Sequence, residues 1–185
     1  MQKHRRPAAL NPKARRQKIF NRAILVGTII VIVVVTAYAF SRPQPATLPV
    51  YLSRCIPLRG PYAYNSTFQI FIIVNGANAS VPKGIGIEGS CVRPIFTLSG
   101  SGTVHISTDQ NRVYTLGDFF LVWGNTYGSN WATFNSNQLW SMQAGNGHYL
   151  SMTVNNSTNT DFENYRLPIN GDTTFNPYKI VISYT

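Results

Sequence analysis

His105 and His148 are the two histidines that follow the long apolar segment, and they are the natural candidates for metal or acid–base chemistry. A blue-copper centre needs two histidines, a cysteine and a methionine, with the cysteine, one histidine and the methionine close together on one loop. Cys91 lies far from His148, and no cysteine stands just upstream of His148 and Met152. We therefore expect no metal site and no cofactor, with His105 as a strand residue and His148 as a residue of a surface turn.

Carboxylates and hydroxyls do not form a catalytic set in the sequence either. Asp161 and Glu163 could face the same way on a strand, but this spacing is far more typical of surface carboxylates than of a catalytic pair. Asp118 is better explained as a helix cap. Residues 99–102 (SGSG) match neither the G-x-S-x-G nucleophile turn nor a phosphate-binding loop. The sequence predicts a protein that is not an enzyme.

Trp131 and Trp140 stand, with Tyr127 and Tyr149, in a stretch rich in Asn and Gln, a composition compatible with carbohydrate stacking or partner contact. The alternative is that these rings form the core of an Asn-rich β domain, because strands must bury apolar side chains and few aliphatic residues lie nearby. The core interpretation is favoured. A glycan-binding surface predicts that Trp131 or Trp140 is exposed in the isolated domain.

Cys55 and Cys91 are the only cysteines of the chain. In an oxidising compartment a disulfide between them is the expected state, with two free or buried thiols as the alternative. Four N-x-[ST] sequons, at which an extracytoplasmic protein can be glycosylated, begin at Asn65, Asn78, Asn155 and Asn156.

The start of the chain indicates where these residues work. Residues 1–22 hold eight basic residues and no acidic one, and residues 23–40 form an uncharged apolar run. As a helix this run would extend about 27 Å, close to the roughly 30 Å of a bilayer's hydrocarbon core. A basic segment before such a run stays cytoplasmic. We expect a single-pass cell-membrane protein, in contact with membrane lipid, whose C-terminal domain is extracellular or pseudoperiplasmic.

A cleaved signal peptide is the competing interpretation, because Ala37, Tyr38 and Ala39 match a small-x-small cleavage pattern. The basic region is unusually long for a signal peptide, which favours an uncleaved anchor. The formal net charge of +10 does not indicate nucleic-acid binding. Half of the 16 basic residues lie in residues 1–22, and the others are nearly balanced by six acidic residues.

The remaining chain divides into a linker and one domain. Residues 41–50 contain three prolines, which favour an extended linker. Residues 51–185 are enough for one domain with its own core. The fold class is predicted as α+β and β-rich: a mostly antiparallel β domain, a β-sandwich or β-grasp-like, with one short helix.

Runs of β-branched and aromatic residues predict strands at 68–74, 77–81, 94–98, 103–107, 112–114 and 178–184. Asn75 and Gly76 predict a tight hairpin turn after the first strand. Thr115 and Asp118 form a capping box in front of an apolar run, which predicts a helix that stops at Gly124. Residues 125–165 predict short strands joined by turns.

Several motifs occur in order: 71–76 (FIIVNG), 81–87 (VPKGIGI), Cys91, 102–106 (GTVHI), 114–120 (YTLGDFF) and 123–124 (WG). Over roughly residues 60–125, the chain resembles an uncharacterised family of extracytoplasmic domains of archaea and some bacteria, often anchored by a single helix. The resemblance implies a membrane-tethered scaffold. The strand, the Thr-Leu-Gly-Asp segment and the apolar helix are also similar to those of β-grasp folds.

Members of that family usually carry a His-x-His pattern at the first strand and a Leu-His-Thr-His-Asp segment after the cysteine, which would suit a metal site. The corresponding residues here are 62–68 (YAYNSTF) and 95–99 (IFTLS), and of the family's histidines His105 alone is matched. The resemblance therefore supports the scaffold and argues against a metal function in this chain.

These observations predict a non-catalytic, membrane-anchored extracytoplasmic domain that acts as an accessory or structural subunit of a membrane or envelope protein complex. Its expected partners are membrane lipid and other membrane-protein subunits, with no nucleic acid and no small-molecule substrate. The archaeal flavour of the resemblance makes one specific form an alternative, an accessory subunit of an archaeal copper-dependent ammonia monooxygenase complex, although no residue of the chain selects it. The alternatives are a cell-envelope glycan-binding module and a residual metal-binding protein.

Overall fold

The computed structural model describes the chain at residues 12–41, 43–57, 60–168 and 178–185. It divides into two compact units, Met1–Arg42 and Pro43–Thr185. The second unit is a β-rich domain in which one helix is longer than a single turn, and it includes most of the segment 41–50 that the prolines suggested as a linker.

The first unit contains one long helix, α1 (Pro12–Ser41). Its apolar window, Ile24–Ser41, has a mean hydropathy of 2.5, and none of this window is buried inside the structure. The hydroxyls of Thr28 and Thr36 donate to carbonyls four residues earlier, each at 2.9 Å, so that both are satisfied within the helix. The length and composition of this window are those of a membrane anchor or a signal sequence.

In its described residues, the second unit contains the α-helices α2 (Val50–Ser53) and α3 (Leu116–Tyr127). Short 3-10 turns lie at Ser129–Trp131 and Phe162–Asn164. The strands are β1 (Tyr64–Val74), β2 (Ala77–Ala79), β3 (Ile87–Glu88), β4 (Cys91–Val92), β5 (Ile95–Phe96), β6 (Thr103–Thr108), β7 (Phe134–Asn135), β8 (Gln138–Leu139), β9 (Met142–Gln143), β10 (Leu150–Val154), β11 (Ser157–Asn159) and β12 (Tyr178–Tyr184).

Most of the strand predictions are confirmed, and one is wrong. The predicted strands other than 112–114 appear as β1, β2, β5, β6 and β12, with some change of length. Tyr114 is instead buried in the core, where its hydroxyl donates to Thr108 Oγ1 at 3.3 Å. Its carbonyl accepts the Leu167 N–H at 2.8 Å, so the backbone at Tyr114 bonds to a late loop.

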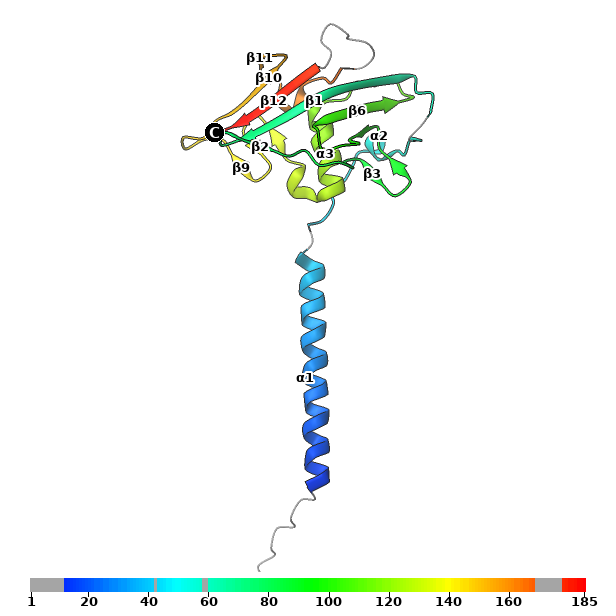
Figure 1. Ribbon diagram of the computed structural model, residues 1–185, viewed down its shortest axis with the longest axis vertical. Coiled ribbons are helices and arrows are strands. Elements are labelled where there is room, and N and C mark those ends of the chain that lie inside the picture. The colour runs from blue at the N-terminus through cyan, green and yellow to red at the C-terminus, as the bar shows by residue number, and fades with distance from the viewer. Residues whose placement is uncertain (1–11, 42, 58–59, 169–177) are drawn as a thin grey trace, which may run out of the picture. The chain divides into compact units, whose positions relative to one another are not determined.

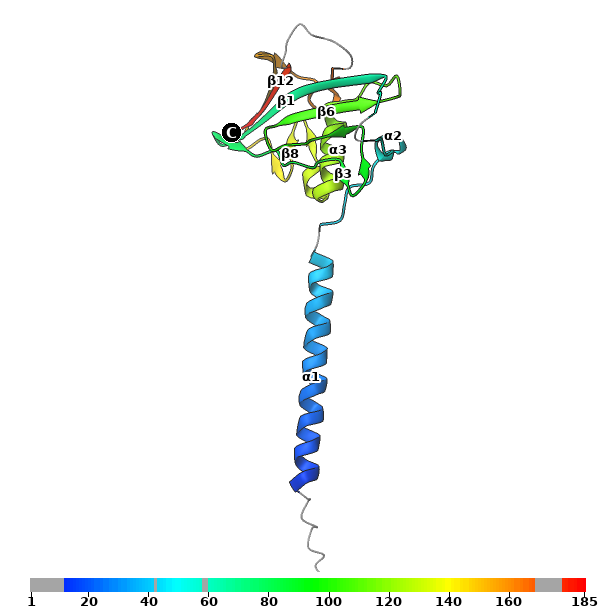
Figure 2. The same ribbon diagram turned by 45° about the vertical axis from the view of Figure 1, so that its right-hand side comes forward.

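The main sheet has the strand order β11-β10-β12-β1-β6-β5, and β2 also pairs with β1. Within the described strands, β1 and β12 run parallel, from Phe68 opposite Tyr178 to Val74 opposite Tyr184, and the other pairs are antiparallel. The described residues also form two small sheets, β3-β4 and β7-β8-β9. Figure 1 shows α3 against one face of the main sheet, and Figures 1 and 2 place α2 and the β7-β8-β9 sheet on opposite sides of α3.

The hydrophobic core lies between α3 and the main sheet. It is filled by alternate residues of the central strands and by aromatic residues of α3, each exposed by no more than 1 %: Phe68, Ile70, Ile72, Ile180, Ile182, Phe119, Phe120 and Trp123. Burial of side chains of this size stabilises a fold by about 1.5–3 kcal/mol each. Phe68 and Phe119 meet edge to face, with ring centroids 6.3 Å apart, and join the sheet to the helix.

The predicted capping box at the start of α3 is confirmed. Thr115 Oγ1 accepts the Asp118 N–H at 3.3 Å, and Asp118 Oδ2 accepts the Thr115 N–H at 2.9 Å. The predicted end of the helix at Gly124 is wrong, because α3 continues to Tyr127 and is capped by Gly128. A side chain at Gly124 would come within 2.4 Å of the Ala132 Cβ. Gly124 therefore permits close packing and does not stop the helix.

Cys55 and Cys91 form a disulfide across a sequence separation of 36 residues. A loop of this length constrains the unfolded chain, and its closure stabilises the fold by about 3–4 kcal/mol in the chain-entropy model. The disulfide connects the segment after α2 to β4. Its presence fits a domain that folds in an oxidising compartment.

We expect the double variant Cys55→Ser/Cys91→Ser to lose about 3–4 kcal/mol of its free energy of unfolding. Equilibrium denaturant unfolding in detergent measures this loss. A reductant should lower the stability of the wild type by a similar amount and leave the double variant unaffected. Equal stability of the oxidised wild type and the double variant would contradict the prediction.

Candidate functional site

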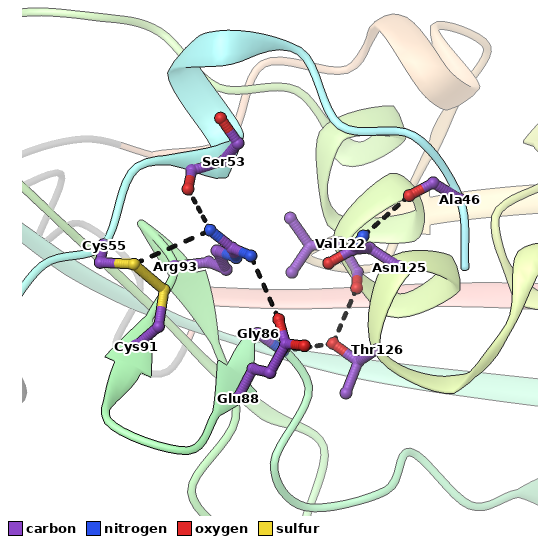
Figure 3. A network of polar contacts seen from close by, with 10 residues as sticks. All are labelled: Ala46, Ser53, Cys55, Gly86, Glu88, Cys91, Arg93, Val122, Asn125 and Thr126. Atoms are coloured by element: carbon purple, nitrogen blue, oxygen red, sulfur yellow. Dashed lines mark hydrogen bonds and ion pairs between the residues drawn. A yellow bond between two sulfur atoms is a disulfide. The ribbon is translucent and has the colours of Figure 1, made fainter.

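Residues 43–49, here called the strap, lie along α3. The Ser129 N–H donates to the Gln44 carbonyl at 2.7 Å, and the Ala46 N–H donates to the Gly124 carbonyl at 3.1 Å. Asn125 Nδ2 donates to the Ala46 carbonyl at 2.8 Å, as Figure 3 shows. The strap therefore begins at the C-terminal end of α3 and is part of the folded domain.

Gly128 makes the close approach between the strap and α3 possible. Its φ of +112° belongs to a region that side-chain-bearing residues rarely adopt, and a Cβ at this position would lie 2.6 Å from the Pro43 Cβ. Its N–H caps the helix by donating to the Gly124 carbonyl at 2.9 Å. The same carbonyl thus accepts one bond from the helix end and one from the strap.

After the strap, α2 is bound to the other end of α3. Leu52 is fully buried in the core, and the Tyr51 hydroxyl donates to Asp118 Oδ1 at 2.8 Å. Asp118 is itself buried. Both of its carboxylate oxygens accept hydrogen bonds, Oδ2 from the Thr115 N–H of the helix cap and Oδ1 from the Tyr51 hydroxyl. Spacing in the sequence predicted the capping role of Asp118 but held no signal for Tyr51, which lies 67 residues away.

The phenol of Tyr51 stays protonated as a donor in this arrangement. Desolvation by burial raises the pKa of Tyr51, and the hydrogen bond to Asp118 and the charge of that carboxylate raise it further. Arg112, whose guanidinium carbon lies 3.4 Å from the centre of the Tyr51 ring, lowers this pKa to a smaller extent. The balance favours a neutral hydroxyl that donates to Asp118 Oδ1.

Arg93 joins α2 to the β3-β4 hairpin beside the disulfide (Figure 3). Its Nη1 donates to the Ser53 carbonyl and lies 3.9 Å from Cys55 Sγ, while its Nη2 is 3.3 Å from a carboxylate oxygen of Glu88. Just before β3, the Gly86 N–H donates to Thr126 Oγ1 of α3 at 2.9 Å. Hydrogen bonds thus connect the strap, α2, the hairpin and α3 to one another.

Trp131 and Trp140 meet in one aromatic cluster with Trp123. The rings of Trp123 and Trp131 are nearly parallel, with centroids 5.4 Å apart, and Trp140 stands edge-on to Trp131 at 4.8 Å. Trp131 is 38 % exposed, whereas Trp140 is half-buried and its indole N–H lies buried without a partner in the described structure. Most of Trp140 therefore serves packing, and Trp131 retains some accessible surface.

The four sequons lie in strands or turns of the domain. Asn78 is exposed on β2, and Asn156 is exposed in the turn between β10 and β11. Asn155, in the same turn, accepts the Lys179 N–H on its Oδ1 at 2.9 Å. Asn65, on β1, accepts the Ser107 hydroxyl on its Oδ1 at 3.1 Å.

The two histidines and the pair Asp161 and Glu163 lie in different elements of the domain. His105 lies on β6 and stacks on Phe96, with ring centroids 5.3 Å apart, and His148 stacks on Tyr184 at 5.4 Å. Asp161 is the N-cap of the 3-10 turn Phe162–Asn164 and Glu163 lies within that turn, so the two carboxylates do not share a strand. Across the described ranges, no group of three or more His, Cys, Asp or Glu side chains is placed to hold a metal ion.

Comparison of the chain with protein-family models, with curated proteins and with solved structures finds no match. The strap with its contacts to α3 and α2 is the feature of this fold that has the clearest consequence for function, and it is our candidate site.

We expect Gly128→Ala to release the strap, because the new Cβ would collide with Pro43. Gly145→Ala is the matched control, since Gly145 has a φ of +115° but nothing within 4 Å of its added Cβ. Both variants should lose about 1–2 kcal/mol through backbone strain. Hydrogen exchange of the Ala46 and Ser129 amides should accelerate about tenfold or more in Gly128→Ala alone. Equal protection of these amides in both variants would disprove the release.

The stability of the domain should fall in mild acid through His105. Burial lowers the pKa of His105 below its usual value of about 6.5. The unfolded chain then binds the proton more readily, so this contribution is complete above about pH 6.5 and is lost as the pH falls. Denaturant midpoints between about pH 7.5 and pH 5.5 should therefore fall less in His105→Gln than in the wild type. An identical pH dependence in both proteins would show that His105 does not contribute.

Proposed function

We propose that the protein is a non-catalytic, membrane-anchored extracytoplasmic domain that acts as an accessory or structural subunit of a membrane or envelope protein complex. The observation that carries the proposal is the strap. The candidate span ends at Ser41 and the folded domain begins at Pro43, so that a single residue separates them in the sequence. A long flexible linker would let a domain search a large volume, but a linker that is hydrogen-bonded to its domain cannot.

The proposed orientation rests on charge and on redox chemistry. The basic residues that precede α1 favour a cytoplasmic N-terminus, and the disulfide favours an oxidising compartment for the domain. Within this assignment, α1 is an uncleaved anchor that contacts membrane lipid, and Asn65, Asn78, Asn155 and Asn156 are glycosylation candidates. We also propose a β-grasp-like description of the fold, because a first hairpin, a helix and a last strand parallel to the first are arranged around one sheet.

The proposal includes a specific form, in which the complex is an archaeal copper-dependent ammonia monooxygenase. Its support is the archaeal flavour of the resemblance over residues 60–125. A glycan-binding module is the second candidate function. The exposed part of Trp131 favours it, and the stacking of Trp131 on Trp123 reduces the ring surface that a sugar can use.

Native mass measurement of the detergent-extracted protein from its own membranes, with mass spectrometry of the components, tests the proposal. We expect a species of defined composition far larger than the 20.6 kDa chain, in which the chain retains residues 23–40. Gly128→Ala should reduce the fraction of the chain found in this species, because the released strap is no longer hydrogen-bonded to the domain. Gly145→Ala should leave that fraction unchanged. A wild-type chain that migrates alone near 20.6 kDa plus detergent would overturn the subunit assignment.

A further inference from the structure

A basic hollow opens on the surface where α2 meets the loop before α3. It has a volume of about 670 Å³ and is lined by Val50, Tyr51, Ser53, Arg54, Gln110 and Arg112. Two arginines and no acidic residue stand among these lining side chains. Arg54 and Arg112 are far apart in the sequence, which is why composition along the chain did not reveal the patch.

Arg112 is held ready for an anionic ligand. Its guanidinium lies over the ring of Tyr51, with 3.4 Å between the guanidinium carbon and the ring centre. Tyr51 is in turn fixed by its bond to the buried carboxylate of Asp118. A planar guanidinium whose orientation is already fixed loses little freedom when it binds a carboxylate through two parallel N–H bonds.

The charge of Arg112 is not neutralised by an ion pair within the described ranges. Two ion pairs occur there, Arg54 with Asp109 at 2.9 Å and Arg93 with Glu88 at 3.3 Å. The Arg54–Asp109 pair is exposed, and exposed pairs contribute only about 0–1 kcal/mol, so a second carboxylate can share Arg54 at little cost. The hollow therefore offers one unpaired guanidinium and one that is easily shared.

An apolar rim accompanies these charges. Val50 lines the hollow and is 88 % exposed, and Val113, the neighbour of Arg112, is 52 % exposed. A small polar anion would make no use of exposed aliphatic side chains. A protein segment that alternates acidic and aliphatic residues would use both the guanidinium groups and the valines, which is the usual combination at protein–protein contacts.

The hollow and the point at which the chain enters the domain lie near opposite ends of α3. The chain enters the domain at Pro43, beside Gly128 at the C-terminal end of α3. The hollow lies beside Tyr51, which is bonded to Asp118 in the first turn of α3. About 15 Å of helix separates these two ends at 1.5 Å per residue. The hollow is thus well separated from the point at which the chain enters the domain.

We infer that the basic hollow binds an acidic segment of a partner protein, with its carboxylates on Arg112 and Arg54 and an aliphatic side chain against Val50. This inference rests on the proposed subunit function and names the surface and the chemistry through which the domain is bound. Other anions of the cell envelope are weaker candidates because they do not use the apolar rim.

The test uses the full chain in nanodiscs of neutral lipid and a fluorescent peptide of alternating glutamate and leucine. Fluorescence anisotropy should show binding that is lost when lysine replaces glutamate in the peptide. Arg112→Gln should weaken the binding about tenfold, and Arg112→Lys should give an intermediate affinity because it keeps the charge but not the planar group. Lys83→Gln is the matched control, since it removes one exposed positive charge outside the hollow and should leave the affinity within about twofold.

Two outcomes would overturn the inference. The first is an equal affinity of the wild type and Arg112→Gln for the acidic peptide, with both proteins folded to the same thermal midpoint. The second uses nanodiscs that contain anionic phosphatidylglycerol: if the affinity ratio between wild type and Arg112→Gln disappears there, lipid head groups occupy the hollow. If either outcome occurs and the native mass measurement still finds a large complex, the hollow is not the contact surface but the proposed subunit function is unaffected.

Discussion

The parallel pairing of β1 with β12 is the constraint on which the rest of the domain depends. These strands join residues more than 100 positions apart in register, and both turn their large apolar side chains to the same face. Parallel neighbours require a crossover of the intervening chain, and the crossover here carries α3 across that face. Phe119, Phe120 and Trp123 then fill the space that the strands leave. The position of α3 follows from the central pair.

The strap and α2 depend on α3 in turn. The helix presents bonding groups at both ends: a shared carbonyl at Gly124, and the carboxylate of Asp118. The segment that follows the anchor uses both, and the disulfide and Arg93 fix α2 from the other side. A chain that could have been a free tether is thereby held against the domain over the length of one helix.

Sequence reasoning was accurate where structure is decided by neighbouring residues. The capping box of Thr115 and Asp118, the turn at Asn75 and Gly76, and the last strand are local patterns, and all are present. It failed at Gly124, where the helix continues to Tyr127 and the glycine makes room for Ala132, and at residues 112–114, where the Tyr114 carbonyl bonds to a distant loop. The bond between Tyr51 and Asp118, the stack of Arg112 on Tyr51 and the docking of the strap depend on contacts between segments far apart in the sequence, for which a single sequence carries no local signal.

The central position of β12 also affects the biogenesis of the domain. A ribosome that adds about 5–20 residues per second needs roughly 5–20 s to proceed from β1 to β12. During this interval β1 lacks its partner β12, and the side chains of Phe68, Ile70 and Ile72 are only partly buried. The nascent domain thus presents an unpaired edge to other chains until β12 has been made. An unpaired strand edge can pair with another chain, so completion of β12 also removes a site for such pairing.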